Sequence, residues 1–203
     1  MYFIIHRVRS QVVFCLKFRL NSVLIDFSRF YIIIYSMELT IILHNIRSTY
    51  NVGAILRTAE GFGVSRVILS GYTPKVHDAG LLPHLREKLD HEIHKTALGA
   101  EEMLDIYASG DIISELSRLR DEGWQVIGLE NNIEDERLFD IGSQEFHERL
   151  GEKVALVLGE EVSGIDYSLY DIIDLFAEIP MKGQKESFNV SVAAGVAMWE
   201  MMK

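Results

Sequence analysis

Short β-branched runs alternate with helix-like segments from Met37 to the end of the chain. The predicted strands are Leu39–Leu43, Arg66–Leu69, Trp124–Leu129, Lys153–Leu158 and Ile172–Ile179. The run Lys153–Leu158 is almost wholly apolar, which is typical of a parallel strand covered on both faces. Strands that alternate with helices predict an α/β fold with a parallel sheet.

The segments between these strands predict helices and one long loop. The expected helices are 51–62, 100–107, 111–122 and 190–202. Gly61 and Gly63 should end the first of them. Residues 71–95 are polar around Pro74 and Pro83, so we expect a loop there, with a short helix near Leu85. Loops of this length in compact domains are often functional.

Residues 1–36 differ from the rest of the chain. They hold five basic residues and one acid, a net charge of +4, which leaves −14 for residues 37–203. Charges interrupt the segment too often for the roughly 18 apolar residues of a membrane helix. We expect an atypical basic and apolar extension, either a targeting presequence or a misassigned start with translation beginning at Met37.

Composition and charge narrow the class of protein. A chain of 203 residues can bury one sizeable core, and we find no repeat or linker within 37–203. The single cysteine, Cys15, excludes an internal disulfide and favours a reducing compartment, so we expect a cytoplasmic protein. A formal charge of −10 disfavours general nucleic-acid binding, so an RNA partner would need a local basic patch.

A first candidate motif opens the helix after the first strand. Asn51 is expected to cap this helix, Gly53 permits close approach of another backbone, and Arg57 projects from the second turn. Taken alone, the motif favours an ordinary capped helix with a surface pair between Arg57 and Glu60.

Two further motifs follow the last two predicted strands. Gly159, Glu160 and Glu161 form a glycine-rich turn after Lys153–Leu158, where ligands of parallel sheets bind. Beyond the last strand, a polar loop carries Ser187 and Asn189, and Ser187 is expected to cap the final helix. Either motif alone also fits ordinary turns and caps.

Together, the three motifs resemble those of the SpoU/TrmH methyltransferases in the SPOUT superfamily. The matching patterns are N-x-G-x-x-x-R from Asn51, L-G-x-E-x-x-G from Leu158, and I-P-M-x-G followed by S-x-N-V-S-x-A from Ile179. The resemblance runs from Met37 to Trp199, with Phe188 where leucine is usual. It implies a parallel α/β sheet with a C-terminal trefoil knot, and S-adenosylmethionine-dependent methylation of a ribose 2'-hydroxyl in tRNA or rRNA.

The resemblance also assigns residues to the site. The implied catalytic residues are Arg57, Asn51, Glu161, Ser187 and Asn189, and the implied cofactor-binding residues are Leu129, Gly159, Ile179 and Phe188. Because a guanidinium stays protonated near neutral pH, we expect Arg57 to bind a phosphate and to stabilise alkoxide charge, while its role as a base stays open. Glu161 is expected to orient Asn51 or Arg57. The implied site uses no metal.

Partners follow from the same resemblance. The first-motif helix and the C-terminal helix should meet across a homodimer, so that one subunit completes the site of the other. The predicted RNA contacts are Arg47, Arg57, Lys182 and Lys185, with Arg66, Lys75, His77 and Arg86 as further candidates.

Other classes of function fit less well. A dehydrogenase would need G-x-G-x-x-G directly after a strand, and Gly61 and Gly63 lie at a helix end. His91 and His94 are three residues apart, whereas zinc hydrolases of the H-E-x-x-H type place them four apart. A non-catalytic RNA- or cofactor-binding protein on the same fold, and a base-methylating SPOUT enzyme, remain alternatives.

Overall fold

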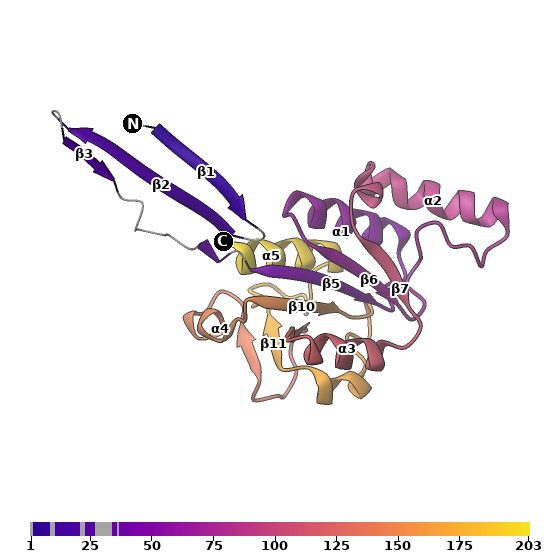
Figure 1. Cartoon of the computed structure of the whole chain (residues 1–203). Coiled ribbons are helices and arrows are strands. Elements are labelled where there is room, and N and C mark those ends of the chain that lie inside the picture. The colour runs from indigo at the N-terminus through magenta and orange to yellow at the C-terminus, as the bar shows by residue number, and fades with distance from the viewer. Residues whose placement is uncertain (1, 9–10, 21–22, 27–33, 36) are drawn as a thin grey trace. The chain divides into compact units, whose positions relative to one another are not determined.

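The computed structural model describes residues 2–8, 11–20, 23–26, 34–35 and 37–203, which fall into two compact units (Figure 1). In the first unit, Met1–Met37, strand β2 (Gln11–Leu20) pairs antiparallel with three others. These are β1 (Tyr2–Val8), β3 (Val23–Asp26) and β4 (Ile34–Tyr35). The second unit, Glu38–Lys203, contains all three motifs.

The second unit is built on a seven-stranded sheet in the order β7-β6-β5-β10-β8-β11-β9. Its strands are β5 (Glu38–His44), β6 (Arg66–Ser70), β7 (Ile106–Ser109), β8 (Gln125–Leu129), β9 (Leu138–Asp140), β10 (Lys153–Leu158) and β11 (Leu175–Glu178). Every ladder between neighbours is parallel. The prediction of a parallel α/β sheet is therefore confirmed.

Helices cover both faces of this sheet. The elements are α1 (Thr49–Gly61), α2 (Pro83–Ala97), α3 (Ile112–Asp121), α4 (Gln144–Arg149) and α5 (Val190–Met202), with short 3-10 helices at Ala100–Glu102 and Tyr167–Ile172. Figure 1 shows α1 and α5 on one face and α3 on the other. In the part of the chain that is described, no helix has the length and apolar character needed to cross a membrane.

The core follows from the alternation of side chains along each strand. On the face that α3 covers, Ile42, Val126 and Phe176 pack with Leu116 and Leu119 of that helix. Burying each such side chain contributes roughly 1.5–3 kcal/mol relative to leaving it exposed. This packing anchors the strands, and with them the loops at their carboxyl ends.

The prediction of a long loop over 71–95 is wrong for its second half. Helix α2 begins with Pro83 in its first turn and runs for 15 residues to Ala97. The short helix expected near Leu85 lies within α2, but its length was underestimated because charged residues obscure a narrow apolar stripe, of which Ile93 and Ala97 are buried. This stripe packs against α1 at Gly53. If Gly53 had a Cβ atom, it would lie 2.3 Å from the Ile93 carbonyl oxygen.

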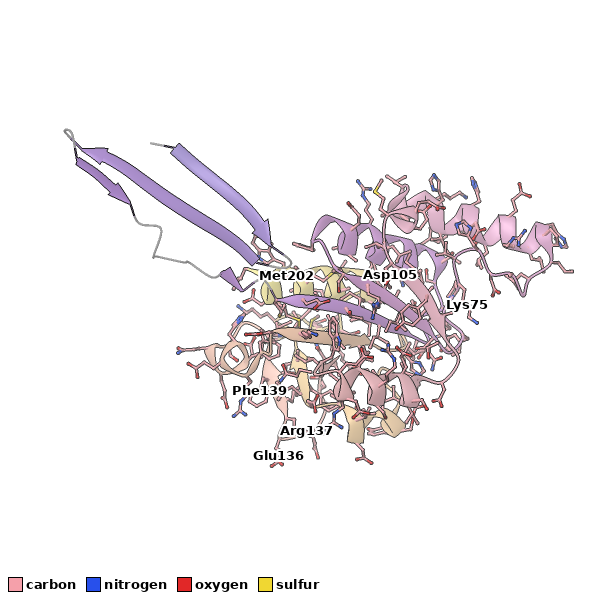
Figure 2. All side chains as sticks on the ribbon, in the orientation of Figure 1. Lys75, Asp105, Glu136, Arg137, Phe139 and Met202 are labelled. Atoms are coloured by element: carbon pink, nitrogen blue, oxygen red, sulfur yellow. The ribbon has the colours of Figure 1, made fainter. Side chains whose placement is uncertain are left out.

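Other expected elements need correction as well. Ala100–Tyr107 is a single 3-10 turn followed by β7, because pairing with β6 overrides its helical pattern. The last strand starts at Leu175 rather than Ile172, since a 3-10 helix occupies the preceding residues. Strand β9 and helix α4 were not predicted, and both are short. Arg137, labelled in Figure 2, ties the start of β9 to the Ile173 carbonyl oxygen at 2.6 Å.

Two helix caps also differ from expectation. Ser48, rather than Asn51, caps α1, and its hydroxyl accepts a hydrogen bond from the Asn51 amide at 3.3 Å. Asn189, rather than Ser187, caps α5 and accepts from the Ser191 amide at 2.9 Å. As a result, the side chain of Asn51 is available for contacts outside its own helix.

Candidate active site

An open cavity of ≈ 190 Å³ lies where β8, β10 and β11 end. Its walls are Leu129, Glu130, Asn131, Leu158, Gly159, Glu160, Glu161, Val162, Gly164, Ile179, Ser187, Phe188, Asn189, Val190 and Ala193. Ligands of parallel α/β sheets bind at this edge. The cavity brings together all four residues predicted to bind a cofactor and three of the five predicted to be catalytic.

One wall is the turn between Gly159 and Gly164. The backbones of Glu160 and Gly164 exchange two hydrogen bonds of 2.9 Å. A Cβ on Gly159 would lie 2.4 Å from the Gly164 carbonyl carbon, so only glycine fits there. Within the turn, the Glu160 carboxylate accepts hydrogen bonds from Ser163, which lower the pKa of this carboxyl.

Glu161 joins this turn to the start of α1. Its carboxylate accepts hydrogen bonds from the backbone amides of Arg47 at 3.1 Å and Ser48 at 3.3 Å, and from Asn51 Nδ2 at 3.0 Å. Burial opposes ionisation of this carboxyl, but the hydrogen bonds from Arg47, Asn51 and Ser48 outweigh it and lower the pKa of Glu161. The ionised carboxylate therefore fixes the first-motif loop against the second motif.

The third motif joins the same network through two asparagines. Asn189 Nδ2 donates a hydrogen bond to Asn51 Oδ1 at 3.2 Å, and the Asn189 Oδ1 atom caps α5. Asn51 is thus in direct contact with Glu161 and Asn189, which lie 110 and 138 positions further along the chain. The structure brings Asn51, Glu161 and Asn189 into one cluster, and Ser187 lies on the adjoining wall of the cavity.

The opposite wall contains two residues that the motifs did not indicate. Asn131 binds the backbone of Ile179 twice, accepting at 3.2 Å and donating at 3.1 Å. Glu130 accepts from the Ile165 amide at 2.8 Å. A polar run directly after the predicted strand Trp124–Leu129 was the available signal, because such residues lie at the carboxyl edge of the sheet.

Arg57 does not line this cavity. It is exposed on α1, six residues beyond Asn51, and it has no ion-pair partner among the residues whose side chains are described. In particular, Arg57 does not form the surface ion pair with Glu60 that its spacing on the helix allows. The structure of one chain therefore leaves Arg57 available to a ligand outside the chain's own cavity.

The other predicted RNA contacts fall into two groups. Arg47 forms an ion pair with Glu160 at the rim of the cavity, and its side chain is 58% exposed. Lys182 and Lys185 are exposed in the loop that carries the third motif. The secondary candidates lie elsewhere: Arg66 pairs with Asp105 at 3.1 Å, and His77 lies between Asp90 and Glu102.

A buried histidine stabilises the loops after β5 and β6. His44 Nε2 accepts a hydrogen bond from Asn45 Nδ2 at 3.1 Å, so Nδ1 carries the ring proton and donates to Ser70 Oγ at 2.9 Å. Burial lowers the pKa of His44, while Asp166 partly opposes the shift. The hydrogen bond that Nε2 accepts from Asn45 requires the neutral ring, whereas Nδ1–H can donate to Ser70 in either protonation state.

Stability should therefore depend on pH near neutrality in a residue-specific way. The unfolded chain protonates His44 near pH 6.5, and the folded chain does so only at lower pH, so stability is lost as the pH falls below about 6.5. Thermal unfolding between pH 7.5 and 5.5 should show a smaller loss for His44→Gln than for the unmodified protein. If His44→Gln lost as much stability between pH 7.5 and 5.5 as the unmodified protein, this pH dependence could not be assigned to His44.

His77 provides a control of opposite sign. Hydrogen bonds to Glu102 and Asp90 raise the pKa of His77, so its contribution is present at low pH and is lost as the pH rises through the raised pKa. The His77→Gln protein should still lose stability as the pH falls below 6.5. It should lose less stability than the unmodified protein as the pH rises above that value.

No group of three or more His, Cys, Asp or Glu residues in the described part of the chain is arranged to hold a metal ion. His91 and His94 are both exposed on α2, and His94 is bound to Glu101 at 2.5 Å.

Fold and site together define a parallel α/β protein with a ligand cavity at the carboxyl edge of its sheet.

The chain belongs to the SpoU rRNA Methylase family, whose family model matches residues 38–199. It is 33% identical over 165 residues to the 23S rRNA (guanosine-2'-O-)-methyltransferase RlmB of Xylella fastidiosa, a match that covers 81% of this chain and 58% of that protein. A putative TrmH family tRNA/rRNA methyltransferase of Staphylococcus aureus is 29% identical over 168 residues, covering 82% and 59%. The chain thus spans somewhat more than half the length of these curated relatives.

Solved structures support the fold. An AdoMet-bound rRNA methyltransferase from Sinorhizobium meliloti aligns with a TM-score of 0.65 at 22% identity, covering 82% of this chain and 56% of that one. A TrmH/SpoU tRNA modifying enzyme of A. aeolicus aligns with a TM-score of 0.63 at 21% identity, covering 83% and 77%.

Proposed function

We propose that this protein is an S-adenosylmethionine-dependent methyltransferase that modifies a ribose 2'-hydroxyl of ribosomal or transfer RNA. The observation that carries the proposal is the contact of Asn51 with both Glu161 and Asn189, which joins the three family motifs at one cavity. The names of the X. fastidiosa and S. aureus relatives support this reaction and substrate class.

The cavity suits the proposed cofactor in charge and in polarity. Glu130, Glu160 and Glu161 line it, with no Lys or Arg among the lining residues, which favours a cationic sulfonium over a phosphate-bearing ligand. Phe188 lines the cavity and leaves apolar surface exposed, against which an adenine ring could pack. We therefore propose that Leu129, Gly159, Ile179 and Phe188 bind the adenosine. The bound cofactor would supply an electrophilic methyl group.

The residues of this chain would position the acceptor. Asn51 and Asn189 hold the two motif helices against the turn at Glu161, and Ser187 contributes a hydroxyl to the same wall. We assign to Arg57 the binding of the phosphate beside the target ribose and the stabilisation of alkoxide charge, with the proton leaving to water or to a phosphate oxygen. Displacement at a sulfonium carbon needs no Lewis acid, so the proposed reaction uses no metal and no covalent intermediate.

A homodimer would place Arg57 at a cavity. On α5, Val192, Val196 and Trp199 are exposed at spacings of four and three residues, which puts them on one face of the helix. Tyr50 of the neighbouring α1 is exposed as well. We propose that this apolar surface, the α1/α5 face, binds a second copy, so that Arg57 of one protomer faces the cavity of the other.

RNA would approach over the basic residues at the rim. Arg47, Lys182 and Lys185 are exposed around the cavity, and Arg57 of the second protomer would join them. Because residues 37–203 carry a formal charge of −14, this local patch must supply the phosphate contacts, and binding should weaken steeply with salt. An enzyme of ribosomal or transfer RNA would act in the cytoplasm.

We also propose that residues 37–203 form the methyltransferase domain, with 1–36 as an extension outside it, and that the C-terminal segment is knotted. The family match over 38–199 supports the first proposal. The knot is proposed from the family resemblance. The Ile165 amide and the Ile179 backbone are both hydrogen-bonded to the loop at Glu130 and Asn131, which is compatible with it.

The test is mass-spectrometric mapping of ribose methylation in total RNA from cells with and without the gene. Loss of one 2'-O-methyl mark, restored by the unmodified gene but not by Arg57→Ala, is the expected result. Loss of a methyl group from a base would favour a base-methylating enzyme instead. An unchanged methylation pattern would favour a non-catalytic RNA- or cofactor-binding protein.

A further inference from the structure

One large aromatic side chain near the cavity is not accounted for by the proposed reaction. Tyr72 lies two residues beyond the end of β6, and it is 56% exposed. It belongs to none of the three motifs, and it does not line the cavity. A single exposed aromatic side chain is ordinary by itself, so a role for Tyr72 has to be argued from how firmly it is held and from what lies near it.

The backbone under Tyr72 is fixed by a chain of hydrogen bonds. The Tyr72 amide donates to Asn45 Oδ1 at 3.2 Å, Asn45 Nδ2 donates to His44 Nε2 at 3.1 Å, and His44 binds Ser70 at 2.9 Å. A Cβ on Gly71 would lie 1.8 Å from Asn45 Oδ1, and Gly71 has φ +63°, so only glycine fits before the tyrosine. The ring is therefore displayed to solvent from a rigid base.

The loop that carries Tyr72 lies against the segment that leads to Arg47 at the rim of the cavity. The Tyr72 backbone amide donates to Asn45 Oδ1 at 3.2 Å, and the Ile46 backbone amide donates to Thr73 Oγ1 at 3.0 Å. Arg47 follows Ile46 directly and pairs with Glu160. Partial desolvation and the negative charge of Glu160 raise the pKa of the Tyr72 phenol, so the phenol stays protonated and neutral at physiological pH.

Arg47 complements the ring. Its backbone is bound to Glu161 at 3.1 Å and its guanidinium to Glu160, so its position is fixed from two sides while 58% of the side chain stays exposed. A fixed cation and a fixed aromatic ring on adjoining loops match one phosphate and one base of a single-stranded RNA. A folded protein partner would require a larger continuous apolar area than one tyrosine provides.

We propose that Tyr72 is a substrate-binding residue, on which an unpaired base adjacent to the target ribose stacks while Arg47 binds the neighbouring phosphate. The inference rests on the proposed function, because it names the contact that would orient the nucleotide at that same site. It also predicts that the substrate is unpaired at the modified position, since a base within a duplex cannot reach the ring.

The test compares Tyr72→Leu, which keeps apolar bulk without a π face, with Tyr72→Phe, which keeps the ring. The probe is ribosomal RNA from cells that lack the gene, methylated with radiolabelled S-adenosylmethionine. We expect Tyr72→Leu to raise KM for RNA about tenfold, because one base loses the aromatic face on which it stacks. Tyr72→Phe should stay within about twofold of the unmodified protein, and cofactor affinity and unfolding temperature should be unchanged in both.

The outcomes separate this inference from the proposed function. An unchanged KM in Tyr72→Leu, in a preparation whose unmodified protein is active, would overturn the stacking role alone. Equal losses in Tyr72→Leu and Tyr72→Phe would assign the contact to the hydroxyl and would also overturn it. Absence of methylation of this RNA and of transfer RNA by the unmodified protein would instead refute the proposed function.

Discussion

Arg57→Ala is expected to lower the rate of methyl transfer by about 10²–10³-fold, the usual cost of removing one group that stabilises developing negative charge. The fold and the affinity for S-adenosylmethionine should not change, because Arg57 is exposed and lies outside the cavity of its own chain. Single-turnover rates and calorimetric titration with the cofactor measure the two quantities. A fully active Arg57→Ala protein would remove this residue from the mechanism.

A mixing experiment tells whether Arg57 acts within its own chain or across a dimer. Arg57→Ala is mixed with a second variant, Ala193→Phe. The phenylalanine should fill the cavity from the first turn of α5 and abolish cofactor binding. If Arg57 serves the other protomer, a refolded equimolar mixture of the two inactive variants should regain about a quarter of the unmodified activity, because half of the dimers are mixed and each has one intact site. If Arg57 serves its own chain, the mixture stays inactive.

Trp199→Glu is expected to dissociate the proposed homodimer and to abolish activity at the same time. Trp199 is 61% exposed on the α1/α5 face, and its ring also contacts Phe62, with centroids 6.3 Å apart. Introducing a charge into this surface should raise the dimer Kd by at least about 100-fold, which corresponds to roughly 2.7 kcal/mol. Sedimentation velocity at several protein concentrations gives the Kd.

Two further variants make the dimer result specific. Val192→Glu alters the same face without removing the ring contact, so it should also yield monomers. Met103→Glu introduces the same charge at a residue that is 72% exposed after the 3-10 helix Ala100–Glu102, and it should leave the dimer intact. A Val192→Glu protein that remains dimeric would contradict the proposed interface.

The sheet was predictable because its strands carry their own signals. Lys153–Leu158 is buried at five of its six positions, and its predicted bounds agree with β10. For α2, only a short helix near Leu85 was predicted, and its full length was not, since its single buried stripe follows from packing on Gly53 of α1. Strand β7 depends similarly on its partner β6. Elements that owe their conformation to a distant neighbour leave a weak pattern in their own residues.

The site shows the same division. The family resemblance predicted that Glu161 would orient Asn51 or Arg57, and the structure has Glu161 hydrogen-bonded to Asn51 at 3.0 Å. No motif indicated Asn131 or Tyr72, because their roles depend on which loops meet at the carboxyl edge of the sheet. The assignment of catalytic roles, that of Arg57 above all, remains a prediction that the experiments above address.

One carboxylate has a consequence for binding equilibria. Glu161 lines the cavity while its oxygens hold the amides before α1 and the side chain of Asn51. A ligand that shifts this residue from the cavity side changes the free energy of the loop that would receive RNA. Thermodynamic reciprocity then requires RNA to change cofactor affinity by the same factor. The proposed donor and acceptor sites would therefore be linked, and the affinity of either ligand would have meaning only at a stated occupancy of the other.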